Sequence, residues 1–173
     1  MDIYLHKNRF SREEMYELNR RRLESRGVTV EDIATIALKQ QSKFTENVSF
    51  EICLDSAKKI LSYPDAFHIV QLGIEIDELC EKGMLSYPLQ EILKSDLGLF
   101  GIDELLGLEL AGNFGIIGRT NFGDIDVNKP GIIGKLNDEG KLPGKCHTFL
   151  DDIVGALGAC ASTRVAQIYN EGK

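Results

Sequence analysis

Residues 151–168 read DDIVGALGACASTRVAQI, and this stretch is the most informative about the fold class. Most of its side chains are small, and it contains no proline. Small side chains let neighbouring helices approach closely, because the distance between packed helix axes depends on the residues at the contact. We therefore expect a last helix from near His147 to Tyr169, with other helices packed tightly against it.

Capping residues and apolar stripes predict more helices ahead of this stretch. Ser11 and Glu14 form a capping box, which predicts a helix that ends at Gly27. Further helices are expected to start near residues 29, 49, 64 and 88, and the leucine spacing after residue 98 is also helical. We find no convincing alternating strand pattern, so we expect an all-α fold.

The expected organisation is one compact multi-helix bundle over residues 27–173. Residues 1–26 would form an N-terminal helix with freedom to move. Most of the 17 glycines lie between Gly98 and Gly158. The stretch from about Phe114 to Gly144 therefore predicts a Gly-rich irregular segment before the last helix. Its length indicates a functional segment or short helices that the pattern hides.

Composition excludes several classes of protein. The chain has 173 residues, with 20 Lys and Arg against 27 Asp and Glu, for a net charge of -7. An acidic chain argues against broad nucleic-acid binding. No apolar run approaches the ~20 residues that span a bilayer, and the N-terminus lacks the apolar core of a signal peptide. We expect a cytoplasmic protein without a transmembrane segment, whose four scattered cysteines stay reduced.

Acidic residues within apolar surroundings mark a candidate site. Three pairs or near-pairs stand in the second half: Asp103 with Glu104, Asp124 with Asp126, and Asp151 with Asp152. A carboxylate in an apolar helix pattern is costly unless it is paired or bound to a metal. Carboxylates that converge from separate helices suit Mg²⁺. The alternative is a set of helix N-terminal acids that the macrodipole stabilises.

Other motifs give weaker signals. Asp124 begins a calcium-loop spacing, but Lys129 stands where the loop needs glycine, so an EF-hand is rejected. Cys146 beside His147 does not define a nucleophile, because adjacency in sequence does not place a base on the thiol. Lys129, Arg119 and Arg164 would neutralise a phosphate if their segments converge. For Phe114, Ile116 and Ile117, core packing is expected in preference to contact with lipid.

Three motifs of the second half resemble those of a known family, the phosphatidylglycerophosphatase A family. Residues 101–107, GIDELLG, resemble its hDExxG motif. Residues 126–130, DVNKP, resemble its DxxKP motif, and residues 149–156, FLDDIVGA, resemble its MhDDhhAG motif. The three occur in the family's order. The chain lacks the apolar spanning helices and the N-terminal Gly- and Pro-rich motif of membrane-bound members, and it is more similar to the soluble branch in Gram-positive bacteria.

The resemblance implies an all-helical, Mg²⁺-dependent phosphomonoesterase that converts phosphatidylglycerophosphate to phosphatidylglycerol in phospholipid metabolism. The residues carried over are Asp103, Glu104, Asp126, Lys129, Asp151 and Asp152. The five carboxylates would hold Mg²⁺ or another divalent cation, and Lys129 would bind the substrate phosphate. Glu104 or Asp152 would serve as general base.

Two alternatives to this activity are open from the sequence. The substrate could be a small soluble phosphate ester in place of a lipid headgroup at a membrane surface, where the protein would bind peripherally. The chain could also be a non-enzymatic helical module, a homo-oligomer that keeps the acidic cluster as a structural metal or polar site.

Overall fold

The computed structural model describes residues 9–96 and 101–171, and all regular structure within these ranges is helical. The helices are α1 Arg12–Glu24, α2 Val30–Gln41, α3 Phe50–Leu61, α4 Pro64–Glu81, α5 Leu89–Lys94, α6 Ile102–Gly112, α7 Gly115–Asn128, α8 Ile132–Gly140 and α9 Leu150–Asn170. The all-α prediction is confirmed. Residues 1–8 of the expected N-terminal helical segment lie outside the described residues.

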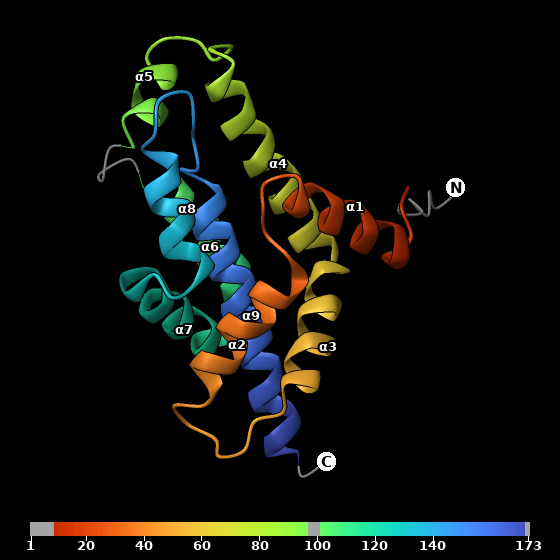
Figure 1. The fold of residues 1–173 in the computed structure, drawn as a ribbon. Coiled ribbons are helices and arrows are strands. Elements are labelled where there is room, and N and C mark those ends of the chain that lie inside the picture. Colours follow the sequence, from red (N-terminus) through yellow and green to blue (C-terminus); the bar gives the residue numbers. More distant parts are fainter. Residues whose placement is uncertain (1–8, 97–100, 172–173) are drawn as a thin grey trace.

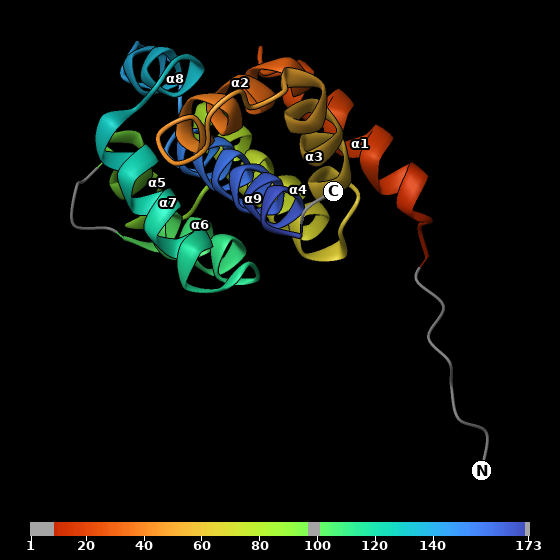
Figure 2. The same ribbon diagram turned by 90° about the horizontal axis from the view of Figure 1, so that it is seen from below.

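Helix α9 is the centre of the bundle, as Figures 1 and 2 show. It packs against α2, α3, α4, α6, α7 and α8, and its residues from Leu150 to Thr163 are all buried. The small residues allow this: a Cβ added at Gly158 would lie 2.4 Å from Cγ2 of Ile36 on α2. The expectation of a tightly packed last helix is confirmed.

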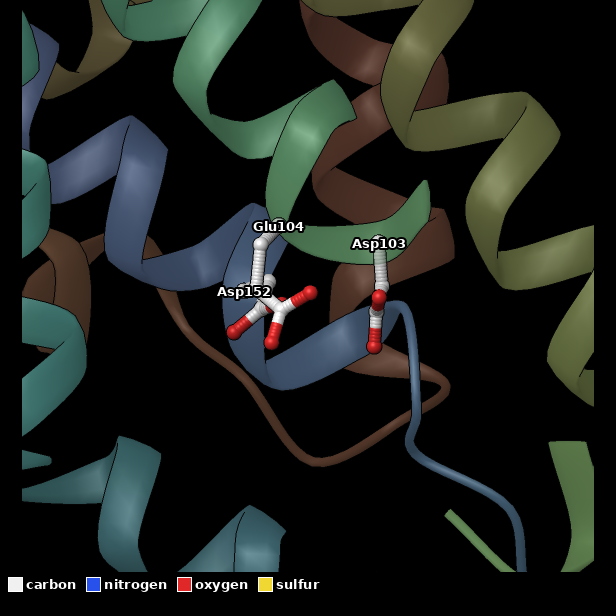
Figure 3. Close-up of side chains that lie close together, drawn as sticks. All are labelled: Asp103, Glu104 and Asp152. Carbon is white, nitrogen blue, oxygen red and sulfur yellow. The ribbon is translucent and has the colours of Figure 1, made fainter. Parts of the chain in front are cut away.

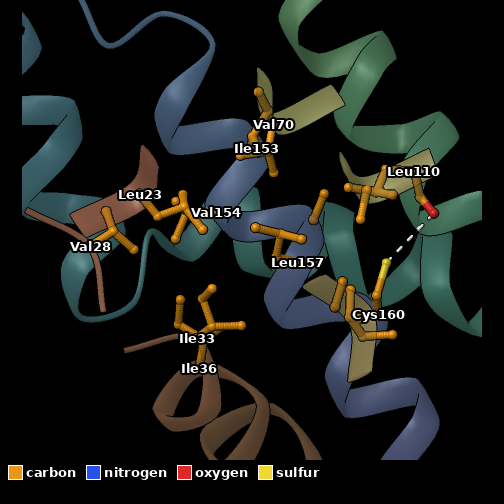
Figure 4. Packing of buried hydrophobic residues seen from close by; sticks show 14 of the residues in the cluster. Leu23, Val28, Ile33, Ile36, Val70, Leu110, Ile153, Val154, Leu157 and Cys160 are labelled. Atoms are coloured by element: carbon orange, nitrogen blue, oxygen red, sulfur yellow. Dashed lines mark hydrogen bonds between the residues drawn. The ribbon is translucent and has the colours of Figure 1, made fainter. Parts of the chain in front are cut away.

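One apolar core joins the helices around α9. Figure 4 shows Leu23, Ile36, Val70 and Leu110 around Leu157 of α9, all of them buried. Burying one such aliphatic side chain stabilises the fold by about 1.5–3 kcal/mol. Because these side chains come from α1, α2, α4 and α6, the core also sets where the first turns of α6 and α9 lie relative to one another.

The predicted helix starts agree with the structure. Ser11 and Glu14 form the expected capping box at α1, and Thr29 forms another with Asp32 at α2. Gly27, with φ of +79°, follows α1 in the left-handed region that favours glycine. The two capping boxes are strong local signals because their side chains satisfy backbone N–H groups that the helix itself leaves unpaired.

α7 and α8 occupy most of residues 114–144, so the prediction of an irregular segment there is wrong, while the alternative of helices that the pattern hides is confirmed. Glycine weakens an isolated helix by about 1 kcal/mol per residue, so the local pattern hides α7. Tertiary packing explains the composition: a Cβ at Gly118 would lie 2.1 Å from the backbone oxygen of Ala111. α7 then ends at Lys129, whose φ of 41° turns the chain toward α8.

Two apolar residues at the start of α7 do not pack in the core. Ile116 is 73% exposed and Ile117 is 55% exposed, which corrects the expectation of core packing for these two residues. Phe114, in contrast, is partly buried against the core. Within the described ranges, none of the helices combines the length and apolar character that a membrane span requires.

Candidate metal centre

The first turns of α6 and α9 bring three carboxylates together. Asp103 and Glu104 follow the left-handed Gly101 that precedes α6, and Asp152 lies in the first turn of α9. Among the described residues, these three each offer one oxygen, and the oxygens lie within 4.8 Å of one another. Figure 3 shows the side chains converging from the two helices.

Both helices contribute a favourable field to this cluster. A helix N-terminus carries a partial positive charge that stabilises nearby carboxylates. All three acids lie in first turns, so the macrodipoles offset part of their mutual repulsion. Close packing keeps the turns together, since a Cβ at Gly107 of α6 would lie 3.3 Å from the backbone oxygen of Asp152.

Asp103 gives the clearest indication that a cation fits this cluster. Its side chain is buried, and within the described part of the chain its Oδ1 atom has no hydrogen-bond partner. Buried polar atoms are almost always paired, so an orphaned oxygen calls for a ligand. A hard divalent cation such as Mg²⁺ fits a set of carboxylate oxygens. The residues present therefore fit the metal that the sequence suggests.

The cluster holds protons tightly when it holds no metal. Burial, together with the charge of Glu104, raises the pKa of Asp103 to about 7. Burial, together with the charge of Asp151, raises the pKa of Asp152 to about 9. Both shifts have the same cause, because a buried carboxylate beside others resists ionisation. A divalent cation would replace these protons.

Lys129 joins the remaining predicted acids to this centre. Its Nζ donates to Oδ1 of Asp126 at 2.7 Å, to Oδ2 of Asp151 at 2.9 Å and to Oδ1 of Asp152 at 3.4 Å. Burial alone would lower the pKa of Lys129, but the attraction of these carboxylates raises it above the ordinary value. Asp152 thus belongs both to the three-carboxylate cluster and to the lysine network.

The predicted site residues therefore form two adjoining groups. Asp103, Glu104 and Asp152 make the cation cluster, while Asp126 and Asp151 contact Lys129. The three-residue cluster includes neither Asp126 nor Asp151, although all five acids were expected as metal ligands. Lys129, expected at the substrate phosphate, is bound by carboxylates in this structure.

Several other candidates lie apart from the site. Asp124 pairs with Lys43, on the other side of α7 from the lysine network. Arg119 pairs with Glu109, and Arg164 pairs with Asp55, so neither contacts the acidic groups.

The Cys146 thiol is buried, and burial raises its pKa far above the ordinary value. A buried, protonated thiol is a poor nucleophile. The structure therefore gives no support to a cysteine nucleophile at position 146.

Asp77 is a site-associated residue that the predictions lack. It lies on α4, is fully buried, and accepts hydrogen bonds from the backbone N–H groups of Phe149 and Leu150 at the start of α9. The available signal is its position on the buried stripe after Val70 and Ile74, where an acid is costly. Its partners are distant in sequence, so the pattern does not show them.

Comparison with known proteins places this arrangement in a family. The Bacillus subtilis protein YutG is 44% identical over 147 residues, which cover 85% of this chain and 87% of YutG. The crystal structure of protein ypjQ from Bacillus subtilis is 38% identical, with a TM-score of 0.88, over 95% of this chain and 100% of that one. The low temperature requirement C protein from Listeria monocytogenes is 41% identical, with a TM-score of 0.85, over 90% of this chain and 97% of that one.

The family model that matches the chain is that of phosphatidylglycerophosphatase A, and the match covers residues 32–167. It contains α3 to α8 entirely and all six predicted site residues. The chain therefore belongs to the phosphatidylglycerophosphatase A family, a family of phosphatases.

Proposed function

We propose that this protein is a Mg²⁺-dependent phosphomonoesterase that hydrolyses phosphatidylglycerophosphate to phosphatidylglycerol and phosphate. The observation that carries the proposal is the buried Oδ1 of Asp103, which has no hydrogen-bond partner among the described residues and lies beside oxygens of Glu104 and Asp152. Membership in a phosphatase family supports a phosphate-ester substrate. Together these point to a metal-assisted reaction at phosphorus.

The three clustered carboxylates would hold the cation. Bound Mg²⁺ supplies a Lewis acid that polarises a phosphoryl oxygen and lowers the pKa of a bound water. Glu104 or Asp152, through an oxygen not used for the cation, would accept the proton of the attacking water. Glu104 is the more accessible of the two, since Asp152 is buried.

Lys129 would balance the charge of the substrate phosphate. Asp126 and Asp151 hold its ammonium group beside Asp152, which places a positive charge next to the cation cluster. An arriving phosphate would compete with these carboxylates for the same N–H donors. The side chain is partly exposed, so it is open to such an exchange.

Exposed apolar side chains support a lipid as the source of the phosphate. Ile102 and Leu105 of α6 are 47% and 53% exposed, and they flank the Asp103–Glu104 pair in the same helix. Ile116 and Ile117 are also exposed, but they follow the opposite end of α6, and Ile117 lines a pocket with Ala166 and Asn170 near the end of α9. Apolar side chains beside a charged site suit a headgroup presented at a membrane surface.

The direct test measures phosphate release from phosphatidylglycerophosphate in vesicles and from small soluble phosphate esters, each with and without Mg²⁺. We expect Mg²⁺-dependent release from the lipid. Phosphate release from soluble esters but not from the lipid would indicate that the substrate is a soluble phosphate ester. Release from neither would contradict the enzymatic proposal and favour the non-enzymatic module.

A further inference from the structure

The chain segment that leads into α9 is held by acidic side chains of α4. Oδ1 of Asp77 accepts the N–H of Phe149 at 3.1 Å, and Oδ2 accepts the N–H of Leu150 at 3.0 Å. One carboxylate thus satisfies two of the backbone donors that a helix leaves unpaired at its start. The N-cap residue of α9 is Phe149, whose side chain carries no hydrogen-bond acceptor, and Asp77 caps the helix from α4.

A second contact, one turn further along α4, holds the start of the same segment. Oε1 of Glu81 accepts the N–H of Cys146 at 3.1 Å, while Arg26 donates to the backbone oxygen of Cys146 at 2.9 Å. Arg26 also forms two hydrogen bonds with Glu81. Residues 146–150 are therefore fixed to α4 at both ends, directly before Asp151.

The complete burial of Asp77 indicates that its hydrogen bonds to the start of α9 are important. None of its side chain is exposed, and a buried carboxylate is costly unless its hydrogen bonds are satisfied. The usual cap at a helix start is a Ser, Thr, Asn or Asp at the N-cap position itself, whereas Asp77 acts from another helix. A carboxylate offers two equivalent acceptor oxygens, and here both are used: Oδ1 accepts the N–H of Phe149, while Oδ2 accepts the N–H of Leu150 and, at 3.3 Å, that of Phe149.

We infer that Asp77 is a positioning residue of the proposed metal centre, which it serves by fixing the first turn of α9 through Phe149 and Leu150. This inference rests on the proposed function. The turn so fixed directs Asp151 to Lys129 and Asp152 to the cation cluster. Asp77 contacts neither metal nor substrate itself. Removing a group that hydrogen-bonds and orients a metal ligand, without binding the metal itself, typically lowers metal affinity by about 10–100-fold.

Calorimetric titration with Mg²⁺ alone tests this on the full chain. Asp77→Asn keeps the shape but turns an N–H₂ group toward one of the two backbone donors. Ile74→Val is the control, because Ile74 is buried on the same helix, one turn away, and lies outside the site. We expect Asp77→Asn to weaken Mg²⁺ binding about 10-fold or more. Ile74→Val should lower Tm by a comparable amount but leave the affinity for Mg²⁺ unchanged.

The possible results separate this inference from the proposed function. Equal Mg²⁺ affinity in wild type and Asp77→Asn would overturn the inference and leave the proposed function standing. A wild type that binds no Mg²⁺ would overturn both. If Asp77→Asn does not fold, Asp77→Ser, with room for a bridging water, takes its place. If neither variant folds, Asp77 is required for folding of the whole protein, and the inference of a specific role at the metal centre is overturned.

Discussion

Lys129 donates to Oδ2 of Asp151 across 2.9 Å, although the two residues are 22 positions apart and lie at the ends of different helices. The contact couples the end of α7 to the start of α9. It also neutralises acids that would otherwise repel one another beside the cation cluster.

Replacing Lys129 by Met should destabilise the metal-free protein. The change leaves Asp126, Asp151 and Asp152 without their shared cation, and we expect a loss of about 1–3 kcal/mol in unfolding free energy. Lys135→Met is the matched control, because Lys135 is 63% exposed and, in the part of the chain that the structure describes, forms an ion pair only with Glu139 at 3.7 Å. The control should change stability by less than about 0.5 kcal/mol. Urea unfolding at pH 7 measures both, and equal losses would count against the network.

Replacing Asp103 by Asn should stabilise the metal-free protein at pH 8. At that pH the buried Asp103 carboxylate is mostly ionised, and its Oδ1 has no hydrogen-bond partner within residues 9–96 and 101–171. The amide removes one negative charge and can donate to the neighbouring carboxylates. We expect a gain of about 1 kcal/mol. Thermal melts without Mg²⁺ give the answer, and a clear loss of stability would indicate a structural role for the charge.

The stability of the metal-free protein should fall as pH rises. Asp103 and Asp152 bind protons more tightly when folded, with pKa values of about 7 and about 9 against 3.8. Such groups stabilise the fold fully at low pH, and this contribution is lost as pH rises through the folded pKa. Melts from pH 5 to 9 should show a falling Tm.

Mg²⁺ should reverse much of this fall, because it replaces the protons at the cluster. Its affinity should rise over the same range, as the protons it displaces become weaker competitors. Asp77, whose pKa burial raises to about 7, adds a pH dependence that Mg²⁺ does not relieve directly. A Tm difference with and without Mg²⁺ that stays constant from pH 5 to 9 would contradict the coupling.

Serine at both Ile102 and Leu105 should weaken action on a lipid substrate only. The two side chains are 47% and 53% exposed, so the double variant should fold normally. We expect a several-fold rise in KM for phosphatidylglycerophosphate in vesicles and no change for a soluble ester. Serine at both Ile116 and Ile117 is the control, since these side chains are also exposed but follow the end of α6 that lies away from Asp103. Unchanged KM in the double variant of Ile102 and Leu105 would exclude this surface from lipid binding.

Local chemistry explains which parts of the molecule could be predicted. The side chains of Ser11 and Thr29 accept hydrogen bonds from backbone N–H groups three residues later, so the local sequence is enough to predict where these helices start. The acids Asp103 and Asp152 are visible because each interrupts an apolar helix pattern. Small residues such as Gly158 predicted the close packing of α9 without showing that Ile36 is the contact.

The missed features depend on contacts between distant residues. α7 is stable because Gly118 packs against the backbone of α6, while its glycines alone indicate a loop. Asp77 accepts hydrogen bonds from residues more than 70 positions away, and nothing beside it in sequence reveals them. Lys129 was predicted to face phosphate, but only the fold shows that Asp126, Asp151 and Asp152 surround its ammonium group.

The central claim is that Asp103, Glu104 and Asp152 form a catalytic metal centre. Its most direct test is the rate of Mg²⁺-dependent phosphate release from phosphatidylglycerophosphate by wild type, Asp103→Asn and the control Asp124→Asn. Both variants lose one negative charge, but Asp124 pairs with Lys43 outside the cluster. We predict a loss of more than about 100-fold in kcat/KM for Asp103→Asn and a rate close to wild type for Asp124→Asn. Wild-type activity in Asp103→Asn would contradict the claim.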